Sequence, residues 1–308
     1  MASTSTAQQD ARIKRSMRND RIATGVLTLI VGIVMLIVVS MVVYILAQGI
    51  GQLFQPGFLT EASRSNGTEG GIAYQLFDSF YLLILTLIIS LPISLGGAVF
   101  LVEYAPEGPV TKIASTAIET LSSLPSIVVG MFGFLMFSVN FGWGYSLISG
   151  AIALTMFNIP ILTRVIQQAL EDVPRSQRDA GLAMGLTRWE TTIHVLLPAA
   201  MPAIVTGVVL SAGRVFGEAA ALIFTAGQSA PVLDFTCLDF SSPSCPWNVF
   251  RPAETLAVHI WKINSEGVVP DLAAISNGTA AVLMVCILAF NILARVIGKY
   301  LERRLTSE

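Results

Sequence analysis

Six apolar segments, each about as long as a membrane-spanning helix, run through most of this chain of 308 residues. About 20 apolar residues in helical form cross the hydrocarbon core of a bilayer, whereas strands usually have about 4–8 residues. The segments are too long for strands, and the alternating stretches of about 10 residues that build an outer-membrane barrel are absent from the sequence. The sequence therefore predicts an all-α integral membrane protein with six transmembrane helices, over residues 22–47, 76–102, 113–139, 146–170, 199–226 and 276–298.

The composition supports a membrane protein and excludes several other classes. Charged residues make up only 12% of the chain and hydrophobic residues 54%, whereas a soluble domain has roughly 25% charged residues. The net charge of −2 argues against nucleic-acid binding, which needs a basic face. The three cysteines and two histidines are too scattered for a closed structural zinc site, so no metal site is predicted.

The distribution of lysine and arginine predicts the orientation, because cytoplasmic loops carry an excess of these residues. With both termini in the cytoplasm, 14 of the 18 basic residues lie inside, three lie outside, and Arg214 lies within the fifth span. The prediction is a multi-pass protein of the cell membrane with a transmembrane domain over residues 22–298. The remaining segments are cytoplasmic tails over 1–21 and 299–308, a cytoplasmic loop over 171–198, and outer loops over 48–75 and 227–275.

The long outer loop has two further features. Cys237 and Cys245 are either joined by a disulfide, which an exported compartment permits, or remain two free thiols. Residues 255–261 suggest a short helix lying on the membrane surface, in which His259 is a structural polar group rather than a ligand.

No catalytic motif is present in the sequence. It lacks the phosphate-binding pattern G-x-x-x-x-G-K-[ST], and also G-x-S-x-G, H-E-x-x-H and a paired Cys-x-x-Cys. The chain is therefore predicted not to be an enzyme, and it cannot hydrolyse ATP through a phosphate-binding loop of its own.

The cytoplasmic loop is predicted to contain two short helices that meet at a sharp corner. The Ser176–Asp179 pair is a capping-box pattern, which predicts that the first helix begins at Gln177. Gly185 is a natural end for this helix, because glycine accepts the left-handed conformation just past a helix end. The Thr187–Glu190 pair is a second capping pattern and predicts the start of the next helix.

The first of these helices carries small and apolar residues at helical spacing, namely Ala180, Ala183, Met184 and Thr187. On an exposed cytoplasmic helix such residues suggest a surface that enters another protein. The alternative is a helix packed beneath the protein's own spans.

The same loop resembles the EAA loop of ABC importer permeases, whose pattern is E-A-A, three residues, Gly, nine residues and I-x-L-P. The corresponding residues are Asp179-Ala180-Gly181, then Gly185, then Val195-Leu196-Leu197-Pro198. In that family the short helix is a coupling helix that docks into a groove on a separate ATPase subunit. The resemblance implies the fold of a type I ABC importer permease and an ATPase-coupling site made of Asp179, Ala180, Gly181, Ala183, Met184, Gly185 and Pro198.

Two further stretches resemble phosphate importer permeases. Leu124–Gly133 is similar to their P-S-I-V-x-G-x-F-G stretch, and Gly213–Gly227 is similar to their G-R-x-x-G-E-x-A-P-L-L-F-T-A-G stretch, with Ala221 where Pro is usual. The likeness is greatest to the PstA-type subunit, with the PstC-type second. It implies ATP-driven import of inorganic phosphate across the bacterial cytoplasmic membrane. A permease for another oxyanion, molybdate or sulfate, and a carrier driven by an ion gradient are the alternatives.

The resemblance also implies a set of partners. These are a homologous second permease subunit of the PstC type, a dimer of PstB-type ATPase subunits and an external phosphate-binding protein of the PstS type. ATP and magnesium belong to the ATPase, and this chain itself carries no cofactor.

Arg214 and Glu218 are ionisable residues within the fifth predicted span, where such groups usually face a bundle interior or an aqueous cavity. Four residues apart in one helix, they are expected to share a face. Either they form an ion pair that only locks helices together, or Arg214 meets a passing anion and Glu218 neutralises it in the anion's absence. A planar guanidinium suits an oxyanion because it donates two parallel hydrogen bonds.

Pro125 and Gly130 are expected to loosen the third predicted span, which suits either a pathway wall or a packing kink. Together with the resemblance, this gives a predicted substrate pathway of Arg214, Glu218, Ser126 and Pro125.

Overall fold

The computed structural model of the chain describes residues 2–62, 70–106, 108–237, 239–266 and 272–305. Every regular element in these ranges is helical. The chain divides into two compact units, Met1–Gln48 and Gly49–Glu308. The first unit lies within α1 (Ala2–Leu53), which includes the apolar stretch Asn19–Leu53, with a mean hydropathy of 3.1. Its length and composition suit a membrane span, as predicted for residues 22–47.

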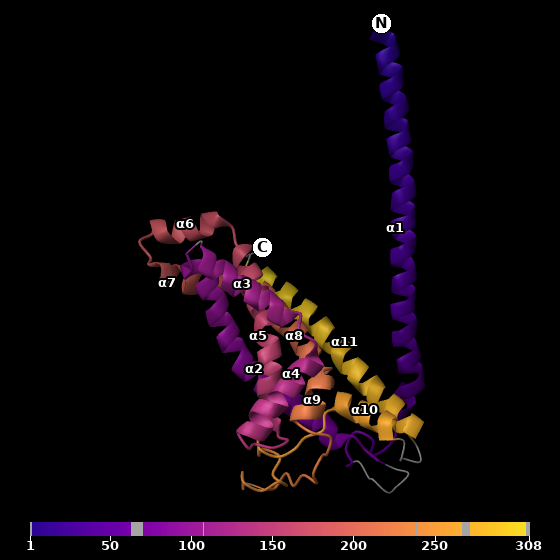
Figure 1. The fold of residues 1–308 in the computed structure, drawn as a ribbon, viewed down its shortest axis with the longest axis vertical. Helices are drawn as coiled ribbons and strands as arrows, with labels where there is room; N and C mark the ends of the chain where they lie inside the picture. The colour runs from indigo at the N-terminus through magenta and orange to yellow at the C-terminus, as the bar shows by residue number, and fades with distance from the viewer. Residues whose placement is uncertain (1, 63–69, 107, 238, 267–271, 306–308) are drawn as a thin grey trace. The chain divides into compact units, whose positions relative to one another are not determined.

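Four long helices run lengthwise through the second unit (Figure 1). They are α2 (Ala73–Val99), α5 (Leu147–Glu171), α8 (Leu197–Phe216) and α11 (Leu272–Leu305). A π-helical turn, Phe100–Tyr104, continues α2, and α7 (Arg188–Thr191) with a second π-helical turn, Thr192–Leu196, leads into α8.

Short helices lie at the two ends of this unit. The C-terminal end of α11 marks one end of the unit, and α6 (Arg175–Ala183) and α7 lie at this end (Figure 1). The helices α9 (Ala220–Thr225) and α10 (Leu256–Glu266) lie toward the opposite end. The helix pairs α2–α5 and α8–α11 make the most extensive contacts within the unit.

The third predicted span, 113–139, is not one continuous helix. It is made of α3 (Pro109–Ser122) and α4 (Ser126–Gly133), the latter extended by the π-helical segment Phe134–Asn140, and the two halves meet at a bend of 96°. The break is local, because Pro125 is extended (φ −60°, ψ 132°) and disfavours helix at the residue before it. The described residues thus contain five helices able to cross a membrane, or six if this bent pair is one span.

The fifth predicted span, 199–226, is also interrupted. Helix α8 ends at Phe216, and α9 begins only at Ala220. The helix α9 packs on α4, where a side chain on Gly130 would lie 2.6 Å from the Cα atom of Ala221. The break falls at Gly217, the C-cap residue of α8, and the α4–α9 contact joins residues far apart in the sequence.

The helix predicted over 255–261 exists as α10, and its first half is buried in its unit. Its first residues, Leu256, Ala257 and Val258, are buried, and the helix packs against α2, α9 and α11. Leu256 and Val258 join the core formed with Leu82 and Leu154, whereas Trp261 is exposed. The location of this helix on the membrane surface stays a prediction.

Buried polar side chains link the central helices. Asn158 of α5 donates from its amide to Ser90 Oγ of α2 at 3.1 Å, and Ser211 of α8 donates to Asn158 Oδ1 at 2.5 Å. Such bonds are well suited to a membrane bundle, since lipid cannot satisfy polar groups.

Candidate functional site

The helix pair α6–α7 forms the predicted corner. Gly185 has φ +84°, and its N–H donates to Leu182 O at 3.0 Å while Leu186 N–H donates to Gly181 O at 3.3 Å. These two bonds are the Schellman arrangement that ends a helix at a left-handed residue. The prediction that Gly185 ends the first helix is therefore confirmed.

The second predicted cap is also confirmed. Thr187 Oγ1 accepts the N–H of Glu190 at 3.2 Å, and Glu190 Oε2 accepts the N–H of Thr187 at 2.8 Å. The hydrogen bonds from the backbone and hydroxyl of Thr187 hold the pKa of the Glu190 carboxyl below its usual value.

The first predicted cap is wrong. Helix α6 begins at Arg175 rather than Gln177, and Ser176 makes no capping bond at its start. Pro174, extended at ψ 134°, occupies the capping position, and its carbonyl accepts the N–H of Gln177 at 3.0 Å. The proline starts the helix earlier because its fixed φ suits the residue that precedes a first turn.

One face of the corner is open. Asp179, Ala180, Ala183 and Met184 are exposed, and 83% of the surface of Met184 is accessible. Gly181 instead faces α7 and is buried; a Cβ atom there would lie 2.7 Å from Thr191 Cγ2. The substitution of Gly for Ala in the motif thus permits close packing of α6 on α7.

The corner is attached to the bundle by an ion pair. Arg178 of α6 pairs with Glu103, which lies in the π-helical turn at the end of α2. The side chain of Glu103 is only 7% exposed. Pro198 lies in the first turn of α8, where the missing N–H of proline is tolerated.

Arg214 lies in the last turn of α8 and is exposed. Its guanidinium carbon lies 4.5 Å from the ring centroid of Phe157 on α5, within range of a cation–π interaction. Glu218 lies beyond the end of α8, and its Oε1 accepts the N–H of Ala221 at 3.4 Å. The expectation that Arg214 and Glu218 share a helix face is wrong because α8 ends at Phe216, and no ion pair joins them in the structure as described.

A groove of about 820 Å³ runs between α5, α8 and α11, and Arg214 lines it. Arg295 and Lys299 of α11 line the same groove. Sequence reasoning counted these two only as cytoplasmic charges. Their spacing of four residues on one helix face is the signal that could have grouped them.

The structure brings the two phosphate-permease-like stretches together but separates their candidate residues. The stretches meet where α4 packs on α9, at Gly130 and Ala221. Pro125 and Ser126 lie at the start of α4, and neither they nor Glu218 is among the residues that line the groove with Arg214.

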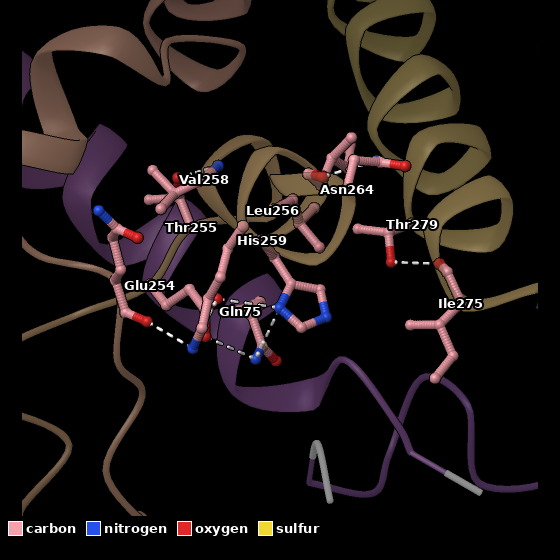
Figure 2. Close-up of polar contacts among 12 residues, drawn as sticks. Gln75, Glu254, Thr255, Leu256, Val258, His259, Asn264, Ile275 and Thr279 are labelled. Atoms are coloured by element: carbon pink, nitrogen blue, oxygen red, sulfur yellow. Dashed lines mark hydrogen bonds and ion pairs between the residues drawn. The ribbon is translucent and has the colours of Figure 1, made fainter. Parts of the chain in front are cut away.

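A buried polar network, shown in Figure 2, joins α2 to α10 and the segment before it. Gln75 Nε2 donates to Glu254 Oε2 at 3.3 Å, and Glu254 Oε1 lies 3.0 Å from His259 Nδ1. Lys262 Nζ lies 3.6 Å from the same carboxylate and donates to Gln228 O at 2.7 Å. His259 is thus a hydrogen-bonded core residue, in keeping with the structural role expected for it.

A fully buried ion pair lies beside this network. Arg251 NH1 and NH2 donate to the two carboxylate oxygens of Asp78 at 3.2 and 2.5 Å, and neither side chain is accessible. The guanidinium also donates to the carbonyls of Pro246 and Pro252. Sequence reasoning missed this pair, because its members are 173 residues apart.

The two loop cysteines are free thiols, the second of the two alternatives. Cys245 Sγ donates to the carbonyl of Cys237 at 3.4 Å. Among the described residues, no group of three His, Cys, Asp or Glu side chains could hold a metal ion.

Another ionisable residue of the bent span, Glu119, pairs with Arg164 of α5. This contact joins α3 to the bundle.

A multi-pass helical unit with a cornered helix pair at one end has the features of a membrane-spanning transport subunit. Residues 94–307 match the family of binding-protein-dependent transport system inner membrane components. The chain belongs to this family, so it is an ABC transporter permease subunit of the importing type. Permeases of this family act with a second permease, a separate ATPase and a binding protein, and are not themselves enzymes.

Two curated relatives are similar over most of their length. The probable ABC transporter permease protein YqgI of Bacillus subtilis (strain 168) is 50% identical over 289 residues, covering 94% of this chain and 98% of the relative. The phosphate transport system permease protein PstA 2 of Mycobacterium bovis is 32% identical over 254 residues, covering 82% of this chain and 78% of the relative.

Solved structures confirm the predicted fold class. The chain is similar to a subunit of the inward-facing MetNI methionine ABC transporter, with a TM-score of 0.55 and 18% identity, covering 75% of this chain and 94% of that one. The chain is also similar to a subunit of a bacterial ABC transporter involved in the import of the acidic polysaccharide alginate. The TM-score is 0.53 and the identity 15%, covering 73% of this chain and 79% of that one. The fold is that of a type I ABC importer permease.

Proposed function

We propose that this chain is the PstA-type permease subunit of an ATP-driven importer of inorganic phosphate. The observation that carries the proposal is Arg214, an exposed guanidinium inside a membrane-spanning helix that lines a groove. An ionisable side chain at such a place is a candidate for the substrate path. The 32% identity to a phosphate transport system permease supports phosphate as the substrate.

The surroundings of Arg214 suit a passing oxyanion. In the part of the chain that the structure describes, the guanidinium has no carboxylate partner, and the face of Phe157 holds its position. A phosphate that loses hydration needs a charge partner, because an unpaired anion is very costly to desolvate. The guanidinium can donate two parallel hydrogen bonds to it, which an ammonium cannot. Glu218, tied to the start of α9, takes no part in neutralising Arg214 in this conformation.

The corner α6–α7 is the proposed docking site for the ATPase, on the cytoplasmic side together with both chain termini. Its exposed residues Ala180, Ala183 and Met184 enter the ATPase surface, which holds the ATP and magnesium. The Arg178–Glu103 ion pair then passes the movement of α6 to α2. A PstC-type permease, a PstB-type ATPase dimer and a PstS-type binding protein complete the assembly.

The test is uptake by the purified assembly in vesicles. The proteoliposomes contain both permeases, the ATPase and loaded binding protein. They should accumulate radiolabelled phosphate only when ATP is present on the side of the membrane that carries the ATPase. Sulfate and molybdate should compete weakly. Uptake of molybdate or sulfate in place of phosphate would assign the permease to another oxyanion. Membership in the importer family argues against the alternative of a carrier driven by an ion gradient. Phosphate uptake without ATP would support that alternative.

A further inference from the structure

Three cations share the groove between α5, α8 and α11. Arg214 lies on α8, and Arg295 and Lys299 lie one helical turn apart on α11. All three side chains are exposed, and within the described residues none of them forms an ion pair with a carboxylate. The cations therefore have hydrogen-bonding capacity available for an anion in the groove.

The close contacts between α8 and α11 fix the order of these cations. Gly213 faces Phe290, and Gly298 faces Thr206, so the two helices run antiparallel. Arg295 then lies about 8 Å along the axis from Arg214, and Lys299 about 6 Å further, at a rise of 1.5 Å per residue. Both steps lead toward the end of the unit that holds α6 and α7 (Figure 1).

The lining suits passage rather than tight binding. Small residues of α8 line the groove beside these cations, with Gly207 between the levels of Arg295 and Lys299 and Ala203 just beyond Lys299. A single deep cation would hold a phosphate firmly, whereas a second and third at short spacing let the ion move on, since conduction needs several weak sites. Glu302, which has a partner of its own, lies three residues beyond Lys299 in the lining, so attraction for an anion falls there.

We infer that this groove carries the transported oxyanion from Arg214 to Arg295 and Lys299, and that these two residues form its release end. The inference rests on the proposed function and adds two pathway residues to it. Its occupant is a tetrahedral oxyanion, and the probe is inorganic phosphate.

A thiol placed in the groove tests the inference without transport. In the full assembly, with Cys237, Cys245 and Cys286 replaced by serine or alanine, a thiol is introduced by Leu210→Cys, a groove residue of α8 between the levels of Arg214 and Arg295. This thiol should react with an anionic methanethiosulfonate faster than with a cationic one. The double variant Arg295→Gln, Lys299→Gln should lower this ratio of rates by about tenfold, since it removes two charges within about 10 Å. Arg303→Gln, which removes a charge from the same helix outside the groove lining, should change the ratio less than twofold.

Uptake of radiolabelled phosphate gives the second readout. Phosphate uptake by the double variant should be about tenfold lower than that of the wild type, whereas uptake by Arg303→Gln should stay near the wild-type value. An unchanged reagent ratio, or no labelling by either reagent, would overturn the groove as an aqueous anion path. A different result would be that the double variant loses phosphate uptake only in vesicles that contain phosphatidylglycerol, and not in phosphatidylcholine alone. That result would make Arg295 and Lys299 a site for a lipid headgroup and would also overturn the groove as an anion path. A wild-type assembly that takes up no phosphate overturns the proposed substrate, whereas the reagent ratio decides the groove independently.

Discussion

Arg214 shows how a single residue can be identified from sequence while its partner is not. Its position in an apolar stretch is visible in the sequence, and the exposed guanidinium lines a groove as a pathway residue should. The partnership with Glu218 failed because it assumed one continuous helix. Helix α8 instead ends at Phe216, and α9 beyond it packs against α4 through residues distant in sequence.

Removal of Arg214 should abolish uptake without disturbing assembly. We expect Arg214→Met to lower phosphate uptake by at least a hundredfold, and Arg214→Lys by at least tenfold because the bidentate hydrogen bonds are lost. Phe157→Leu removes the cation–π contact but keeps the guanidinium of Arg214, so it should have a smaller effect. Uptake in proteoliposomes and co-purification of the ATPase measure the two properties. Near-normal uptake by Arg214→Met would remove this residue from the mechanism.

The pair Asp78–Arg251 makes a prediction about stability. Asp78→Asn leaves Arg251 as a buried, poorly compensated charge, which should destabilise the fold by about 3–5 kcal/mol. The double change Asp78→Leu, Arg251→Met should recover much of that loss, because apolar residues can often replace a buried ion pair. Thermal unfolding of the detergent-solubilised assembly measures both. Equal unfolding temperatures for wild type and Asp78→Asn would contradict a stabilising role for the pair.

The corner between α6 and α7 was predictable as an element because its signals are local. Gly185 and the Thr187–Glu190 cap act within one or two turns, and the structure contains both. The start of α6 was misplaced for an equally local reason, since the pattern at Ser176 competed with Pro174 two residues earlier. Where two local signals conflict, the proline decides because its φ is fixed by covalent geometry.

Gly185→Val should open this corner and uncouple the ATPase. Apart from its chain neighbours, no atom of the described residues lies within 4 Å of a Cβ placed at Gly185, so the effect comes from the backbone conformation at φ +84° and not from a clash. A β-branched residue resists that conformation, whereas asparagine tolerates it. We expect Gly185→Val to lose ATP hydrolysis stimulated by the loaded binding protein, and Gly185→Asn to retain most of it. Full stimulation in the valine variant would argue against docking at the corner.

At the scale of the whole molecule, the sequence predicted the spans whose limits depend on hydrophobic length alone. The predictions 76–102, 146–170 and 276–298 fall on α2 with its π-helical turn, on α5 and on α11. The two spans that the structure interrupts are those whose halves pack on each other as α4 and α9. Pro125 signalled one of these breaks, but the size of a bend depends on tertiary contacts that no local pattern contains.

The contact between Glu103 and Arg178 should determine whether movement of the ATPase reaches the membrane helices. It is the ion pair that ties the proposed docking helix α6 to the end of α2, and the Glu103 carboxylate is almost fully buried. Glu103→Gln or Arg178→Gln should therefore leave the ATPase bound, with its basal hydrolysis intact. Hydrolysis stimulated by the loaded binding protein, and phosphate uptake with it, should fall by about tenfold, because the helix can then move without α2.

The charge swap Glu103→Arg, Arg178→Glu separates this coupling role from a loss of stability. It restores an attraction between the same two positions, so it should recover part of the stimulated hydrolysis that each single variant loses. Thermal unfolding of the same samples shows whether the single variants are merely less stable. If both single variants keep full stimulation, or if the swap recovers stability without stimulation, then force reaches the spans by another route. The chain itself offers two such routes, from α5 into α6 and from α7 into α8.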